Sequence, residues 1–313
     1  MDVLIQLVLL VVGFVMLVKG ADWFVEGASK VAEKFGIPQL VIGLTIVAMG
    51  TSLPEAAVST SAALKGSAEI TIGNVVGSNI MNVLLILGIT SVISPLAVQA
   101  STVKYEIPMV IAATALLAGL GLLDGTVGRI DGIILLAGMV LYLLYLLRMS
   151  LKGQAVSEEI EKSDKNEKLI KLIILIIVGG VMIVWGSDIT VDAATNLARI
   201  FGMSERLIGL TIVAFGTSLP ELVTSATAAI KKKADIAVGN IIGSNLFNIL
   251  FVVGIASAIT PVIYAKDFFI DTIVCLLTAV LLWVCVLRKH KLMRHGGVIL
   301  LVCYAGYFIY LIR

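Results

Sequence analysis

Long apolar stretches, each about the length of a membrane-crossing helix, recur along the entire chain. A helix needs about 20 apolar residues to cross the hydrocarbon core of a bilayer. The stretches are continuously apolar and do not alternate polar with apolar residues, which excludes a transmembrane β-barrel. The pattern predicts an all-α polytopic membrane protein with ten transmembrane helices, at residues 3–22, 39–64, 71–97, 106–123, 130–148, 170–192, 207–230, 236–262, 268–287 and 296–312.

Composition supports this class. Hydrophobic residues make up 59% of the 313 positions, and only 14% are charged, too few to cover the surface of a soluble domain. No basic residue precedes the first apolar stretch and no clean cleavage site follows it, so we interpret it as the first span and not as a signal peptide. The three cysteines, Cys275, Cys285 and Cys303, lie inside apolar stretches at spacings that match no metal motif.

The distribution of basic residues predicts the orientation in the membrane. With ten spans, both termini lie on the same side. If Arg148 and Lys171 at the ends of the adjoining spans are included, the loops that follow odd-numbered spans hold 16 Lys and Arg residues, whereas the other loops and the C-terminus hold six. Cytoplasmic loops carry the excess of positive charge, so both termini are expected outside the cytoplasm of a cell (inner) membrane. This rule also explains the lysines at 231–233 without any nucleic-acid partner.

The second half of the chain repeats the first when position 42 is aligned with position 208. Residues 42–55 read IGLTIVAMGTSLPE and residues 208–221 read IGLTIVAFGTSLPE. Farther along, residues 73–82 read GNVVGSNIMN and residues 239–248 read GNIIGSNLFN. Without any gap, 25 of 43 positions are identical between 41–83 and 207–249. Generic apolar packing would preserve hydrophobicity, but not Thr, Ser, Pro, Glu and Asn at fixed places.

Each half contains five predicted spans, and five is an odd number. The second half therefore enters the membrane from the opposite side, which makes the halves inverted repeats. We expect a first five-helix repeat at 1–148, a cytoplasmic linker loop at 149–169 and a second five-helix repeat at 170–313. Inverted repeats are typical of secondary transporters, whose binding sites lie near the bilayer midplane between the repeats.

Two carboxylates lie near the middles of predicted spans. Glu55 is central in the second span and Glu221 in the seventh, while Asn82 and Asn248 are central in the third and eighth. An ionised carboxylate at that depth costs several kcal/mol unless something compensates its charge. A bound cation would provide that compensation.

A proline precedes each of these glutamates. Pro54 and Pro220 cannot donate to the carbonyls of Gly50 and Gly216, so each helix should bend and expose backbone carbonyl groups at 48–51 and 214–217. Hydroxyl groups lie beside those carbonyls, on Thr51, Ser52, Thr217 and Ser218. The resulting set contains only oxygen ligands, which suits hard cations such as Ca²⁺ or Na⁺.

Two serines lie one helical turn before the central asparagines. Ser78 and Asn82 share a helix face, as do Ser244 and Asn248. We predict cation contact for both pairs, with an interhelical hydrogen bond as the alternative.

Two aspartates, Asp22 and Asp188, fall close to the predicted span ends, where a structural or gating role is expected.

With the GTSLPE and GSNxxN segments identified, the whole chain resembles the cation/Ca²⁺ exchanger superfamily, specifically its prokaryotic Na⁺/Ca²⁺ exchangers. The resemblance implies that Glu55 and Glu221 bind Ca²⁺ and Na⁺ in turn. It implies hydroxyl or carbonyl ligands at Thr51, Ser52, Thr217 and Ser218, and Na⁺-binding carbonyl groups at Ala48 and Ala214. It implies further ligands at Ser78, Ser244, Asn82 and Asn248.

The resemblance also implies a mechanism. The transported ions would be Ca²⁺ and Na⁺, with no cofactor, no enzymatic activity and no obligate protein partner. Spans 1 and 6 would slide across the four motif-bearing helices to open one side at a time. Some relatives, including K⁺-dependent exchangers, carry Asp where this chain has Asn248, so no K⁺ requirement is expected.

Other functions stay open at the level of sequence. An H⁺/Ca²⁺ antiporter of the same fold is the main alternative, since glutamates can carry protons. Both histidines, His290 and His295, lie in the loop between spans 9 and 10, which favours Na⁺. An intramembrane hydrolase would need a base beside a nucleophile such as Ser52, Ser78, Ser218 or Ser244, and no intramembrane His supplies one. A channel would be distinguished by the absence of saturable counterflow.

Overall fold

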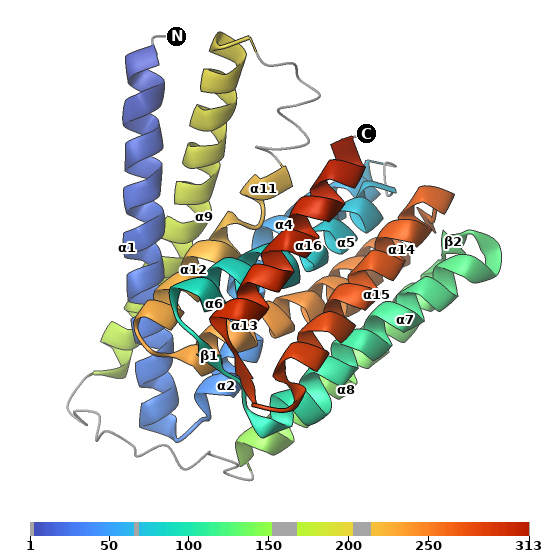
Figure 1. Ribbon diagram of the computed structural model, residues 1–313, viewed down its shortest axis with the longest axis horizontal. Coiled ribbons are helices and arrows are strands. Elements are labelled where there is room, and N and C mark those ends of the chain that lie inside the picture. The colour runs from blue at the N-terminus through green and yellow to red at the C-terminus, as the bar shows by residue number, and fades with distance from the viewer. Residues whose placement is uncertain (1–2, 66–68, 152–167, 203–213, 313) are drawn as a thin grey trace.

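The computed structural model of the chain is almost entirely helical, with two long helices that stand beside a tilted bundle (Figure 1). It describes residues 3–65, 69–151, 168–202 and 214–312. The elements of the first half are α1 (Val3–Phe35), α2 (Gln39–Ile42), η1 (Gly43–Val47), α3 (Ala48–Thr51), α4 (Leu53–Leu64), α5 (Glu69–Met81), η2 (Asn82–Leu87), α6 (Gly88–Ile93), β1 (Leu96–Ala97), η3 (Thr102–Glu106), α7 (Ile107–Asp124), β2 (Thr126–Val127) and α8 (Arg129–Leu151).

The second half follows the same order. Its described elements are α9 (Leu169–Ile200), α11 (Ala214–Gly216), α12 (Leu219–Ile230), α13 (Ala234–Phe247), η5 (Asn248–Val253), α14 (Gly254–Ile259), β3 (Val262–Ile263), α15 (Lys266–Leu287), β4 (Lys291–Leu292) and α16 (Arg294–Ile312). The segments named η are π-helical turns, and η2 and η5 begin at the matched residues Asn82 and Asn248.

Within the described residues, eight helices are long and apolar enough to cross a membrane, and one further span is bent. The bent span joins Gln39–Thr51 to Leu53–Leu64 at an angle of 49°. This bend confirms the kink predicted next to Pro54. The seventh predicted span, 207–230, lies partly outside the described residues, and its described part consists of α11 and α12.

The first and sixth spans are longer than the sequence pattern predicts. The helix expected at 3–22 continues to Phe35, and the helix expected at 170–192 continues to Ile200. Asp22 and Asp188 therefore lie inside α1 and α9 and not at the ends of these two helices. The extension of α1 buries small residues such as Ala28, which apolar run length alone does not register.

Helices α1 and α9 pack against each other along much of their length (Figure 1). Glycines make this approach possible: a Cβ on Gly20 would lie 2.8 Å from the carbonyl oxygen of Gly179, and a Cβ on Gly179 would lie 2.7 Å from that of Gly20. Such small residues allow two backbones to approach closely within a bilayer.

Two short antiparallel ladders join the first half of the chain to the second. Leu96 of β1 pairs with Leu292 of β4, and Thr126 of β2 pairs with Ile263 of β3. Because β1 and β3 occupy matched places in the alignment of the two halves, the two ladders connect the halves in a reciprocal way.

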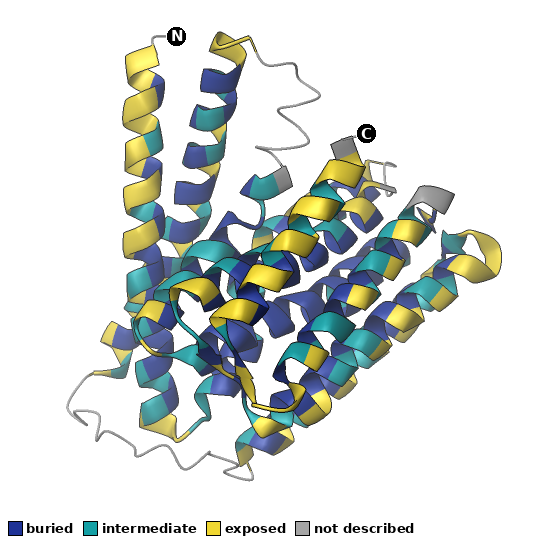
Figure 2. Cartoon of the chain, viewed as in Figure 1, coloured by how far each residue is buried: buried dark blue, intermediate teal, exposed yellow. Residues whose placement is uncertain are grey.

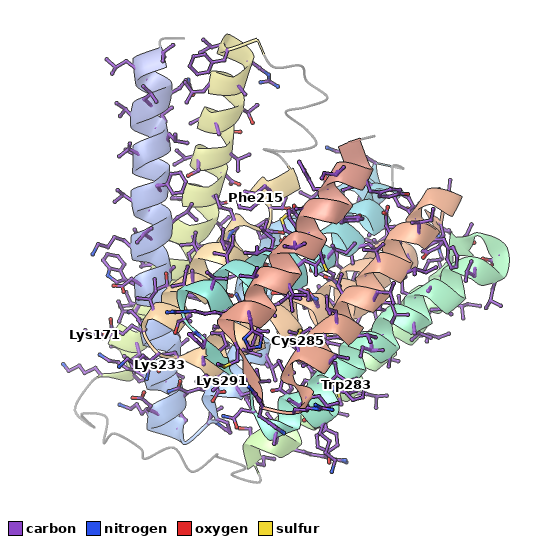
Figure 3. The ribbon with its side chains drawn as sticks, in the orientation of Figure 1. Lys171, Phe215, Lys233, Trp283, Cys285 and Lys291 are labelled. Atoms are coloured by element: carbon purple, nitrogen blue, oxygen red, sulfur yellow. The ribbon has the colours of Figure 1, made fainter. Side chains whose placement is uncertain are left out.

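The centre of the bundle is α13, whose residues are buried from Asp235 to Phe247 (Figure 2). Its counterpart α5 contacts it. The outer faces of α1, α8 and α16 are exposed, as expected of surfaces that meet lipid. Lys171, Lys233 and Lys291 lie in the half of the molecule where α1 ends and α9 begins (Figure 3).

Candidate cation-binding site

The helix is interrupted beside each of the two prolines, which places each central glutamate in the first turn of a new helix. Glu55 is in the first turn of α4 and Glu221 is in the first turn of α12, with a proline at the start of each helix. A helix N-terminus carries partial positive charge and stabilises a nearby carboxylate. Both glutamate side chains have 0% exposure.

The two carboxylates belong to one site although they come from opposite halves of the chain. The Ser52 hydroxyl donates a hydrogen bond of 2.9 Å to Oε1 of Glu221, and the Ser78 hydroxyl donates a longer one of 3.5 Å to Oε1 of Glu55. Among the described residues, neither glutamate forms an ion pair with a basic side chain.

Several oxygen atoms at this site are buried without any hydrogen-bond partner among the described residues. They belong to five of the predicted ligands, as Oε2 of Glu55, Oε2 of Glu221, Oδ1 of Asn82, Oδ1 of Asn248 and Oγ of Ser218. A buried polar atom without a partner costs about 1–3 kcal/mol, and more when it is charged. A cation would compensate this cost for all five oxygens, because each of them can donate a lone pair to it.

The other predicted ligands are placed less uniformly. Thr51 is buried and donates to Oδ1 of Asn240 at 3.0 Å, with the carbonyl of Ala48 at 3.3 Å. Ser244 also lies against that carbonyl, at 3.4 Å. Thr217, the match of Thr51, is only half-buried. Ala214 begins α11, and its side chain lies outside the described residues.

Two pairs of asparagines that the sequence analysis did not single out support the site. The Asn74 amide donates to the backbone carbonyl of Glu55 at 3.3 Å and to Ser59 at 3.0 Å. In the second half, the Asn240 amide donates to the carbonyl of Glu221 at 3.4 Å and to Ser225 at 2.9 Å. The remaining pair is Asn79 and Asn245. All of these asparagines and serines are identical between the repeats, and this identity is the sequence feature that could have singled them out.

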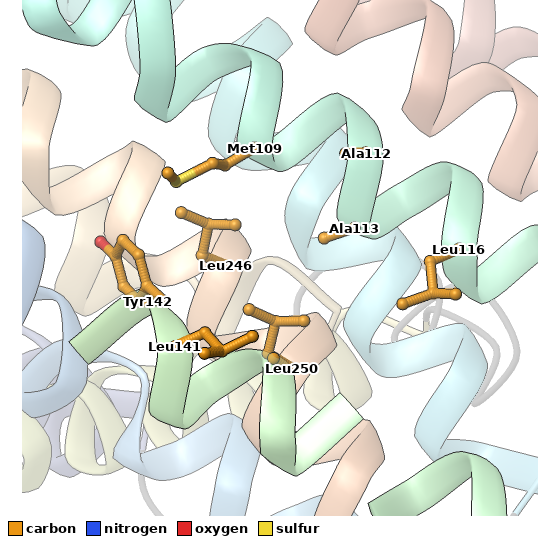
Figure 4. A pocket seen from close by; sticks show the side chains of 9 residues that line it. Met109, Ala112, Ala113, Leu116, Leu141, Tyr142, Leu246 and Leu250 are labelled. Carbon is orange, nitrogen blue, oxygen red and sulfur yellow. The ribbon is translucent and has the colours of Figure 1, made fainter. Parts of the chain in front are cut away.

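A separate apolar cavity of about 270 Å³ opens between α7, α8 and α13 (Figure 4). Its lining is Met109, Ala112, Ala113, Leu116, Gly138, Leu141, Tyr142, Leu246 and Leu250. The Tyr142 hydroxyl is bonded to the carbonyl of Leu44 at 3.2 Å. This apolar lining cannot bind a metal ion, and the cavity is not the cation site.

Comparison with known proteins identifies the family. The sodium/calcium exchanger protein family matches residues 5–148 and 171–313. The inner membrane protein YrbG of Escherichia coli is 37% identical over 90% of this chain and 89% of its own length. The sodium/calcium exchanger MaX1 of Methanosarcina acetivorans is 30% identical over 98% of both chains.

A solved structure has the same fold. The sodium-calcium exchanger NCX_Mj, soaked with 2.5 mM Na⁺ and 1 mM Sr²⁺, superposes with a TM-score of 0.84 at 32% identity, covering 97% of both chains. The family match spans nearly the whole chain and confirms the resemblance seen in the duplicated motifs. The chain belongs to the family of sodium/calcium exchanger proteins, which are membrane antiporters.

Proposed function

We propose that this protein exchanges Na⁺ for Ca²⁺ across the membrane by alternating access to a site built from both halves of the chain. The observation that carries this proposal is the pair of fully buried carboxylates, Glu55 and Glu221, without basic partners among the described residues and beside unpartnered oxygens. Their combined charge of −2 matches one Ca²⁺, and Na⁺ ions must replace it because an empty ionised site is costly to enclose.

The proposed ligands are the side chains of Glu55, Glu221, Thr51, Thr217, Ser52, Ser218, Ser78, Ser244, Asn82 and Asn248 with the backbone carbonyls of Ala48 and Ala214. The five unpartnered oxygens support Glu55, Glu221, Ser218, Asn82 and Asn248 most directly. The carbonyl of Ala48 is supported by its contact with Ser244 from the opposite half.

The proposed architecture is ten helices in two inverted repeats, 1–148 and 170–313, joined by the linker at 149–169. The reciprocal ladders β1–β4 and β2–β3 support this arrangement, as do the π-helical turns that begin at Asn82 and Asn248. The Lys-rich loops would face the cytoplasm and both termini the opposite side.

An asymmetry between matched ion pairs supports alternating access. Lys231, after α12, lies 2.7 Å from Asp22 and 3.8 Å from Glu26 of α1, and Lys233 lies 3.2 Å from Glu33. Glu26, Glu33, Lys231 and Lys233 line a polar cavity of about 230 Å³ between α1 and the start of α13.

The matching residues of the other half do not form the corresponding ion pairs. Lys65 matches Lys231, and Asp188 and Asp192 match Asp22 and Glu26 in the alignment of the two halves. All three counterparts lie within the described residues, and no ion pair joins Lys65 to either aspartate. Helix α1 is thus attached to the core at the Lys231 end, while α9 lacks the matching attachment at the Lys65 end. During transport, α1 would detach at Lys231 while α9 becomes attached at Lys65, and the reverse step would restore the first state.

The decisive experiment measures ⁴⁵Ca²⁺ uptake by purified protein in liposomes loaded with Na⁺ and diluted into choline medium at fixed pH. Uptake that requires the outward Na⁺ gradient, and is lost in Glu55→Gln, is the expected result. Uptake driven only by an imposed pH gradient would keep the site and assign H⁺/Ca²⁺ antiport. Uptake that shows no saturable counterflow would indicate a channel.

A further inference from the structure

Four buried asparagines form a reciprocal network where α5 and η2 cross α13 and η5. The amide nitrogen of Asn82 donates to Oδ1 of Asn245 at 3.0 Å, and that of Asn248 donates to Oδ1 of Asn79 at 3.1 Å. Asn79 and Asn245 also donate to each other's backbone carbonyls, at 3.1 and 3.3 Å. Their exposed fractions are 0% for three of them and 1% for Asn245.

The network determines which end of each amide faces the cation site. An amide group has nearly the same shape when its oxygen and nitrogen exchange places, so only its hydrogen bonds decide its orientation. A backbone carbonyl can only accept, and the carbonyl of Asn79 therefore requires the nitrogen of Asn245. The oxygen of Asn245 must then point the other way, where it can only accept from the nitrogen of Asn82.

The last step leaves Oδ1 of Asn82 buried and without a partner among the described residues, and the same sequence of bonds leaves Oδ1 of Asn248 in that state. The opposite flip would present an N–H₂ group, which repels a cation. We propose that Asn79 and Asn245 are positioning residues that hold the amide oxygens of Asn248 and Asn82 toward the transported ion. This inference rests on the proposed function and adds a role for two residues that are not themselves ligands.

The network also acts across the repeats. Asn245 of the second half orients the ligand of the first half, and Asn79 of the first half orients that of the second. Helices α5 and α13 must therefore keep their crossing during transport if both ligands are to stay correctly oriented. Movement that changes access is then confined to elements outside this crossing, such as α1 and α9.

A double-mutant comparison tests the proposal by Ca²⁺ binding to the purified full-length protein, measured by titration calorimetry. Asn245→Leu frees the Asn82 amide to flip, and it should weaken Ca²⁺ binding about 10- to 100-fold, as losses of supporting contacts to metal ligands do. Aspartate at position 82 presents an oxygen to the ion whichever way its carboxylate turns, and it gives up the hydrogen bond to Asn245. In the Asn82→Asp background, adding Asn245→Leu should change affinity by no more than about twofold, the scatter of independent sites.

Equal losses of affinity in both backgrounds would overturn the proposal, because a general packing defect does not depend on the residue at position 82. Ser257→Ala is the matched control, since Ser257 is buried in α14 and its hydroxyl donates to the carbonyl of Val253, one turn earlier in the same span. It should leave Ca²⁺ affinity unchanged.

The other half of the network supplies a second test if Asn245→Leu does not fold. Asn79→Leu should weaken binding with Asn248 present and not with Asn248→Asp. Failure of both leucine variants to fold would assign the two asparagines to structure and reject the positioning role. The proposed function is tested separately by comparing Ca²⁺ binding in wild type and in Glu221→Gln. It fails if the wild-type protein binds no Ca²⁺, or if Glu221→Gln binds Ca²⁺ as tightly as wild type.

Discussion

The hydroxyl group of Ser52, in the first half of the chain, lies 2.9 Å from Oε1 of Glu221 in the second half. This contact places the bend of one repeat against the carboxylate of the other. Neither half can therefore form the site alone. The remaining oxygen of Glu221, Oε2, is buried without a partner among the described residues and is available to a cation.

Ca²⁺ should stabilise the protein through Glu221. Ligand at about 100 times its Kd adds about 2.7 kcal/mol to the free energy of unfolding at a single site. Glu221→Gln should remove this Ca²⁺-dependent gain, because the neutral amide supplies neither the charge nor a second carboxylate oxygen. Thermal unfolding in detergent, followed by intrinsic fluorescence with and without Ca²⁺, measures the difference. Equal Ca²⁺-induced shifts in Glu221→Gln and wild type would contradict a role in binding.

The ion pair between Lys231 and Asp22 should hold α1 against the core. Lys231→Met is expected to loosen that end by up to about fivefold in equilibrium constant, since partly exposed pairs contribute about 0.2–1 kcal/mol. Its matched control is Lys65→Met, which removes no ion pair with Asp188 or Asp192. A cysteine at Ser29, beside the polar cavity, reports the change through its rate of modification by a membrane-impermeant thiol reagent.

This labelling experiment uses protein whose three native cysteines are replaced by alanine. Faster modification in Lys231→Met alone is the expected pattern. The same rate in both lysine variants would show that the ion pair does not restrain α1.

The glycine contact between α1 and α9 should be intolerant of even a methyl group. Alanine favours helices over glycine by up to about 1 kcal/mol, so an exposed glycine should gain stability from this change. Gly119→Ala, on the exposed side of α7, should do so. Gly20→Ala should instead destabilise the protein, because its Cβ would lie 2.8 Å from the carbonyl oxygen of Gly179. Melting temperatures in detergent measure both effects: Gly119→Ala should raise the melting temperature and Gly20→Ala should lower it. Changes in the same direction would contradict the prediction.

Transport should not require K⁺. Asn248 is neutral, so the site has two carboxylates and no third charge for an additional monovalent cation to balance. Na⁺-driven ⁴⁵Ca²⁺ uptake should therefore proceed at the same rate in choline medium with and without added K⁺. Uptake that disappears when K⁺ is removed would refute this prediction.

The family, the membrane class and the central carboxylates were all predictable from sequence. Length and continuity of apolar stretches are local properties, and so is the bend that Pro54 causes in its own helix. The duplicated motifs identified Glu55 and Glu221 because packing alone would not preserve costly glutamates at matched positions. The ends of α1 and α9 were not predictable in this way, since their extensions bury small residues against neighbouring helices instead of in lipid.

What the sequence by itself determined is which chemical groups are present at membrane depth: two carboxylates, the hydroxyls beside them and the asparagine amides. Tertiary structure alone decided how those groups pair. The positive-inside rule accounted for Lys231, yet its contact with Asp22 joins residues more than two hundred positions apart. The orientation of Asn82 likewise depends on Asn245, a residue of the opposite half. Such pairings depend on how helices cross in space, and the order of residues along one helix does not specify the helix it meets.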